Sequence, residues 1–160
     1  MQLRLNIKPV ELKELGQAAA VMIITDRQSV ALIRRQKRSD DPWSGQIALP
    51  GGLRKPGETL QQTAVRETAE EVGIHVTPAG YVGSYRTHVR DLIVAAFFSF
   101  VDEEPKFSVG EEVEEVNWVK VDCLSPTTTE TGYPAYKYNR GVIWGLTYRI
   151  LGDCLEEFNK

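Results

Sequence analysis

Residues 52–74 read GLRKPGETLQQTAVRETAEEVGI, and three glutamates, Glu67, Glu70 and Glu71, lie in the last third of this stretch at spacing i, i+3 and i+4. If the stretch is helical, this spacing stacks three carboxylates on one face of the helix. Unpaired carboxylates so close together repel one another, and a divalent cation at the shared face would remove that repulsion. Carboxylate oxygens are hard ligands that suit Mg²⁺ or Mn²⁺. The alternative for such a cluster is a solvated acidic face.

The same stretch contains signals for both ends of a helix. Thr59, followed by Gln62 three residues later, forms a capping box that places the N-cap of the helix at Thr59. Gly73 stands where a residue in the left-handed conformation would end the helix. A modest apolar stripe lies on a face separate from the glutamates. The stripe consists of Leu60, Ala64, Val65, Thr68 and Val72.

The whole pattern resembles the Nudix box, G-x5-E-x7-R-E-U-x-E-E-x-G-U, in which U is a bulky aliphatic residue. The matching positions are Gly52, Glu58, Arg66, Glu67, Glu70, Glu71, Gly73 and Ile74. The one departure is Thr68, which replaces the first U with a β-branched residue of similar shape to valine. The resemblance implies an α/β protein with the Nudix fold, in which a mixed β-sheet is sandwiched between helices. It also implies a hydrolase that uses Mg²⁺ or Mn²⁺ to cleave a nucleoside diphosphate linked to another moiety.

The family pattern assigns roles to the charged residues of the box. Glu70 and Glu71 are expected to be the main metal ligands, and Glu67 is expected to be a further ligand or the general base. Arg66 lies four residues before Glu70 and could hold a carboxylate in its rotamer, although a surface ion pair is the alternative. Glu58 precedes the helix, where it could contact the metal and substrate or cap the helix N-terminus.

Two further features extend this predicted site. Gly51 and Gly52 are expected at the substrate and the metal respectively, because glycines let the backbone turn and approach a ligand closely. A second acidic cluster, at residues 111–115, precedes Trp118. In several Nudix enzymes a glutamate at about this distance before the W-x-x strand completes the metal site or acts as the base. Glu112 is the candidate here, and a solvated acidic loop is the alternative.

Two segments bear on the substrate. Residues 45–52 (GQIALPGG) and 142–147 (VIWGLT) resemble segments of the coenzyme A pyrophosphatases of the Nudix family. The arginines of the longer motif of that group are missing upstream of residue 45, but Arg34 and Arg35 place positive charge nearby and are candidates for binding a 3′-phosphate. Trp43 could stack on a base, or simply pack in its loop.

The substrate alternatives are ADP-ribose, a dinucleoside polyphosphate or a nucleoside triphosphate. Two classes without hydrolytic activity also remain open. One is an isopentenyl diphosphate isomerase, which shares the fold but needs a catalytic cysteine, and neither Cys123 nor Cys154 lies in a recognisable site. The other is a Nudix module that only binds nucleotide, which would usually have lost glutamates of the box.

The bulk properties are those of one globular domain. The chain has 160 residues, of which 42% are hydrophobic and 26% charged, with a net charge of −3. This composition indicates neither nucleic-acid nor membrane binding. The N-terminus has no apolar core typical of a signal peptide, and the two cysteines form no disulfide framework, so we expect a cytoplasmic protein. A homodimer is possible.

The remaining sequence predicts strands and helices mixed without βαβ regularity. The expected strands are residues 17–25, 29–35, 47–49, 76–88, 91–102 and 116–121, with the first two forming a hairpin. Residues 91–102 are the most hydrophobic strand and should lie inside the sheet. Residues 125–133 read as a loop, and apolar residues at helical spacing predict a helix over residues 140–158. This order favours a mixed sheet with helices on both faces.

Overall fold

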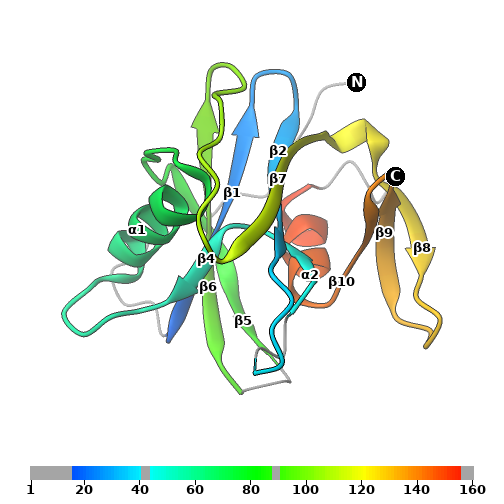
Figure 1. Cartoon of the computed structure of the whole chain (residues 1–160), viewed down its shortest axis with the longest axis horizontal. Helices are drawn as coiled ribbons and strands as arrows, with labels where there is room; N and C mark the ends of the chain where they lie inside the picture. Colours follow the sequence, from blue (N-terminus) through cyan, green and yellow to red (C-terminus); the bar gives the residue numbers. More distant parts are fainter. Residues whose placement is uncertain (1–15, 41–43, 88–90, 156–160) are drawn as a thin grey trace.

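The chain folds around a mixed β-sheet, which is seen in a computed structural model that describes residues 16–40, 44–87 and 91–155 (Figure 1). The strands of this sheet are β1 (Ala18–Thr25), β2 (Ser29–Arg35), β3 (Ile47–Ala48), β4 (Gly51–Leu53), β5 (Gly80–Arg86), β6 (Ile93–Val101) and β7 (Val113–Lys120). Five of them run in the order β3-β2-β1-β6-β5, while β4 pairs with β1 and β7 pairs with β2. β1 pairs in parallel with β6, and the other pairs are antiparallel.

Alternation along β1 divides the interior into two cores. Ala18, Ala20, Met22 and Ile24 point into one cluster of buried residues, while the residues between them point into the other. Because successive side chains of a strand face opposite sides, β1 is covered on both faces. The helix α1 (Leu60–Val72) covers one face, and α2 (Leu146–Cys154) covers the other (Figure 1). The predicted mixed sheet with helices on both faces is confirmed.

The caps of α1 are those predicted from the sequence. Thr59 accepts a hydrogen bond from the backbone of Gln62, and the Gln62 side chain accepts one from the backbone of Thr59, which completes the capping box. Gly73 ends the helix with a φ of 75°, a left-handed conformation that glycine adopts without steric cost. Thr68 packs into the core as expected, but its hydroxyl has no hydrogen-bond partner among the described residues.

The C-terminal part of the chain differs from the prediction. Residues 141–144, expected to start a helix, form the strand β10 (Gly141–Trp144). It pairs with β9 (Pro134–Tyr138), which pairs with β8 (Ser125–Thr128), so part of the expected loop at 125–133 is also a strand. The β-branched and aromatic residues of β10 suit a strand, and Gly145, at a φ of 73°, separates it from α2. Residues 156–158 of the expected helix lie outside the described residues.

The other predicted elements are confirmed with shifted boundaries. β1 and β2 form the expected hairpin, and β6 lies inside the sheet between β1 and β5. The strand expected at 76–88 begins only at Gly80, while β7 begins three residues earlier than expected. The 3₁₀ helix η1 (Val121–Cys123) follows β7. None of the helices in the described ranges is long and apolar enough to cross a membrane.

Candidate active site

The glutamate face of α1 lies against β4, and Glu71 makes the closest link. Its side chain is 4% exposed, and its Oε1 accepts a hydrogen bond of 2.7 Å from the backbone N–H of Gly51. Burial raises the pKa of Glu71 to about 8, although the Gly51 N–H favours the charged form. A carboxylate with so little access to water is stabilised in its charged form by a cation.

Gly52 leaves room for the carboxylate of Glu67. A Cβ atom at Gly52 would lie 2.4 Å from the Cδ of Glu67, which is closer than nonbonded carbon atoms approach. The Glu67 carboxylate therefore occupies the space that any side chain at position 52 would need. Burial also raises the pKa of Glu67 above its usual value, while Arg66 opposes this shift.

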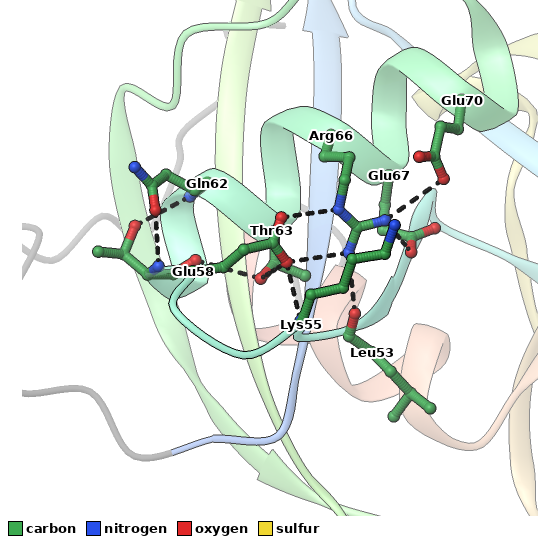
Figure 2. A network of polar contacts seen from close by, with 9 residues as sticks. Leu53, Lys55, Glu58, Gln62, Thr63, Arg66, Glu67 and Glu70 are labelled. Atoms are coloured by element: carbon green, nitrogen blue, oxygen red, sulfur yellow. Dashed lines mark hydrogen bonds and ion pairs between the residues drawn. The ribbon is translucent and has the colours of Figure 1, made fainter.

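Arg66 connects the helix to the loop before it and to β4 (Figure 2). Its guanidinium donates to both carboxylate oxygens of Glu58, at 2.7 and 3.0 Å, and to the backbone carbonyl of Leu53 at 3.0 Å. It also donates to Glu67 at 2.7 Å and to Glu70 at 3.3 Å. Two parallel hydrogen bonds to one carboxylate form a strong charge-assisted pair. Arg66 thus positions three acidic residues at once.

Glu58 is enclosed by donors from its own loop and from α1. Besides Arg66, it accepts hydrogen bonds from the backbone of Lys55 at 2.8 Å and from the hydroxyl of Thr63 at 3.1 Å (Figure 2). Hydrogen bonds from Arg66 and Lys55 lower the pKa of Glu58 to about 2. Glu58 therefore fastens the turn before α1 to Arg66.

Glu70 is the most exposed carboxylate of the box, with 55% of its side chain accessible. Among the described residues, no group of three or more His, Cys, Asp or Glu side chains lies close enough to hold a metal ion in the conformation seen. Instead, Arg66 engages Glu67 and Glu70, and its single positive charge offsets part of their negative charge. The donor set is still that of a hard divalent cation, because it consists of carboxylate oxygens on one helical face, beside a glycine that leaves space for one of them.

The loop before β7 docks on the end of α1. The N–H of Ser108 donates to the carbonyl of Val72 at 2.9 Å, and the N–H of Gly110 donates to the carbonyl of Glu71 at 3.0 Å. These bonds satisfy backbone carbonyls that the helix C-terminus leaves free. They also fix the start of the second acidic cluster beside α1, and Glu112 follows directly.

Glu112 and Glu67 line a common cavity of about 530 Å³. Glu112 is mostly exposed, and its carboxylate lies 3.8 Å from the guanidinium of Arg38. Of the predicted site residues, the cavity lining includes Arg35, Gly51, Gly52, Glu67 and Glu112. A volume of this size is typical of small-molecule sites. The structure therefore brings Glu112 of the second acidic cluster and Glu67 of α1 to one cavity.

Other predicted residues lie away from the cavity wall. Arg34 forms an ion pair with Glu115 at 3.2 Å and donates to the backbone carbonyls of Gly45 and Arg140. It thereby joins β2 to β7 and to the turn between β9 and β10. Trp43 lies outside the described residues. The predicted residues that the structure describes but that do not line the cavity are Arg34, Glu58, Arg66, Glu70 and Glu71.

The opposite wall of the cavity comes from residues that the sequence did not indicate as site residues. It includes Trp144 at the end of β10 and Leu146, Thr147 and Arg149 in the first turns of α2. The one sequence signal at this wall is the resemblance of residues 142–147 to a segment of coenzyme A pyrophosphatases. That resemblance did not assign a site role to any of these residues, because the packing of α2 against the sheet depends on contacts between distant segments.

Comparisons with known proteins find similar sequences over most of the chain. A family model described as the NUDIX domain matches residues 15–138. An ADP-ribose pyrophosphatase of Methanocaldococcus jannaschii is 36% identical over 125 residues, which are 74% of this chain and 73% of that protein. An 8-oxo-dGTP diphosphatase of Haemophilus influenzae is 30% identical over 112 residues, which are 70% of this chain and 81% of that protein.

Some of the relatives are longer than the region that matches this chain. The match spans 35% of an uncharacterized protein of Schizosaccharomyces pombe and 46% of Nudix hydrolase 3 of Caenorhabditis elegans.

The solved structures agree in fold. A MutT protein from Methanosarcina mazei superposes with a TM-score of 0.57 at 25% identity, covering 66% of this chain and 76% of that one.

Proposed function

Since the chain belongs to the Nudix family, we propose that it hydrolyses the pyrophosphate bond of a nucleoside diphosphate derivative with the help of Mg²⁺ or Mn²⁺. The observation that carries this proposal is the glutamate face of α1, which lies against the glycines of β4 and contributes Glu67 to the cavity lining. A polyanionic diphosphate cannot approach such a face unless the negative charge is neutralised. A cation between them meets this need.

Glu67, Glu70 and Glu71 are the residues that would hold the cation. When bound, it would neutralise the diphosphate charge, orient the phosphate oxygens and lower the pKa of a coordinated water. Glu71 is already fixed by the Gly51 N–H, whereas Glu67 and Glu70 are held by Arg66. Arg66 therefore keeps these two carboxylates at the face of α1 and offsets part of their negative charge, and a bound cation would offset the rest.

Glu67 and Glu112 are the two candidates for the general base. Both line the cavity, and each could accept the proton of the attacking water.

Arg35 and Gly51 also line the cavity and are assigned to substrate binding. The remaining candidates for substrate binding act through their partners. Arg34 joins β2 to β7 through its ion pair with Glu115 and so holds the walls of the cavity in place. Glu58 holds the Arg66 side chain in place through their ion pair. Trp43 stays a candidate for stacking on a base.

Coenzyme A is the first substrate candidate. Both segments that resemble coenzyme A pyrophosphatases, residues 45–52 and 142–147, contribute to the lining of the same cavity, which supports a common role in substrate binding. ADP-ribose is the second candidate, and the Methanocaldococcus jannaschii relative favours it. Dinucleoside polyphosphates and nucleoside triphosphates follow. The cavity would hold the nucleotide part of any of these compounds.

The test is chromatographic product analysis after incubation with coenzyme A, ADP-ribose, diadenosine polyphosphates and nucleoside triphosphates, with Mg²⁺, with Mn²⁺ or with excess EDTA. Hydrolysis should require the metal. Glu70→Gln and Glu71→Gln should each lower kcat by about 10²-fold or more, because each removes a ligand charge without removing bulk. The matched control is Glu130→Gln, an exposed glutamate that does not line the cavity. Substantial turnover in EDTA would refute metal-dependent hydrolysis.

A further inference from the structure

The wall of the cavity formed by β10 and α2 contributes none of the groups proposed above to hold the metal or to act as the general base. α2 covers the opposite face of the sheet from α1 (Figure 1). The cavity therefore has walls from both sides of the sheet, and among the carboxylates of α1 it is Glu67 that lines it. If the diphosphate lies against those carboxylates, the wall of β10 and α2 is available to a group attached to it.

Trp144 is the prominent side chain of this wall. Its neighbour Ile143 is fully buried in the core, and alternation along β10 places Trp144 outward, where it is 41% exposed. An indole exposed at a cavity wall offers a flat apolar face that a bound ligand would bury, and burial of an indole is strongly favourable. Within the described residues, the indole N–H of Trp144 has no hydrogen-bond partner.

Tyr133 supports the indole from outside the cavity. The two rings stack with their centroids 5.9 Å apart and their planes at 25°. Tyr133 does not line the cavity, so it limits the motion of the Trp144 side chain without covering the part of Trp144 that lines the cavity. Trp118 shows the contrasting case, since its ring stacks on Phe107 and its indole N–H donates to the carbonyl of Pro105 at 3.1 Å. Trp118 thus has both its ring and its indole N–H engaged, whereas Trp144 stacks on Tyr133 but also lines the cavity.

Arg149 adds a cation to the same wall. Its guanidinium lies 5.8 Å from the centre of the Tyr85 ring and donates to the backbone carbonyl of Arg86 at 2.8 Å. These contacts hold it in place within one helical turn of the start of α2. A flat aromatic surface and a fixed cation in the lining of one cavity suit a ligand that has a planar ring and a phosphate. A nucleotide has both.

We propose that Trp144 is the platform on which the nucleobase of the substrate stacks, and that it thereby selects substrates with an aromatic base. This inference rests on the proposed function and deepens it, because it assigns the base-bearing half of the substrate to the wall of β10 and α2. A substrate group without a planar ring gains nothing from the flat face of an indole.

The test measures binding rather than turnover. Calorimetric titration with AMP, and separately with ribose 5-phosphate, compares the wild type with Trp144→Leu and Trp144→Phe in the presence of Mg²⁺. Trp144→Leu should weaken AMP binding by about five- to a hundredfold, the range for loss of one base–aromatic stack. Trp144→Phe should retain most of the affinity, and ribose 5-phosphate, which lacks the base, should bind all three proteins equally.

A matched control and a second readout separate stacking from a loss of structure. Phe100→Leu truncates another exposed aromatic residue, 55% accessible and outside the cavity lining, and should leave AMP affinity unchanged. AMP should quench the tryptophan fluorescence of the wild type more than that of Trp144→Phe. Failure of wild-type AMP binding, unchanged affinity in Trp144→Leu, or equal losses for AMP and ribose 5-phosphate would overturn the proposal. Because AMP is not cleaved, these outcomes are independent of whether hydrolysis occurs.

Discussion

Gly51 and Gly52 are adjacent in β4, but a side chain at each position would meet a different kind of neighbour. A Cβ at Gly51 would lie 2.2 Å from the backbone carbonyl oxygen of Ala19, in the neighbouring strand. A Cβ at Gly52 would instead meet the end of the Glu67 side chain, at 2.4 Å. A strand pair cannot separate without losing hydrogen bonds, whereas a side chain can rotate away. A side chain at position 51 would therefore strain the sheet, whereas a side chain at position 52 would displace a residue of the site.

Gly52→Ala should consequently damage catalysis and spare the fold. The new methyl group displaces the Glu67 carboxylate, and misplacement of a catalytic group by about 1 Å can cost about 10²-fold in rate. We expect kcat to fall by about 10- to 100-fold, with a Tm close to that of the wild type. Gly51→Ala is the comparison, since its methyl group overpacks the backbone and should destabilise the protein by about 1–3 kcal/mol. Steady-state kinetics and calorimetry on both variants check this, and wild-type kcat in Gly52→Ala would contradict it.

At the scale of the elements, α1 could be predicted from the sequence because its signals are local. The capping box at Thr59, the stop at Gly73 and the glutamate spacing all lie within the helix or next to it. Residues 141–144 show the limit of this approach. They lie beside an apolar pattern of helical period, but pairing with β9 makes them a strand, and no local signal reveals that partner. Site residues on α1 were therefore found, and those contributed by β10 and α2 were not.

The turn before α1 should respond to acid through Glu58. Its pKa of about 2 lies below the usual value because Arg66 and Lys55 bond to the charged form. A lowered folded-state pKa contributes stability above the unfolded-state pKa of 4.5, and this contribution is lost as the pH falls toward 2. The Tm advantage of the wild type over Glu58→Gln should therefore be full at pH 6 and shrink between pH 4.5 and pH 2. A constant difference across that range, measured by thermal denaturation, would contradict this role of the ion pair.

At the scale of the whole molecule, the cavity is a product of the topology. α1 shares a core with the odd-numbered residues of β1, and α2 shares the other core with the even-numbered ones, so each helix reaches the site from its own face of the sheet. The glutamates lie close in sequence, and the box predicts their common face. The convergence of Glu67, Glu112 and Trp144 on one cavity depends on three segments separated by more than 30 residues from each other. Sequence patterns locate such residues singly, and the sheet determines which of them meet.

The buried carboxylates should make the stability of the whole protein depend on pH and metal together. Burial raises the pKa of Glu71 to about 8 and moves that of Glu67 in the same direction. A raised folded-state pKa gives stability that is complete below the unfolded-state pKa of 4.5 and is lost as the pH rises through the folded-state value. In EDTA, Tm should therefore fall between pH 5 and pH 8, by up to about 3–5 °C per pH unit.

Mg²⁺ should reverse this loss, because metal ligation requires deprotonated carboxylates and the cation competes with protons for them. The rise in Tm on adding Mg²⁺ should be small at pH 5 and large at pH 8. Glu71→Gln keeps an oxygen that can accept the Gly51 N–H but carries no charge at any pH. In this variant, the decline of Tm in EDTA should flatten, and the gain from Mg²⁺ should diminish. Thermal denaturation of both proteins across this range, with and without Mg²⁺, makes the comparison. If Tm in EDTA does not change between pH 5 and pH 8 in the wild type, deprotonation of buried Glu71 does not destabilise the fold, and the prediction is wrong.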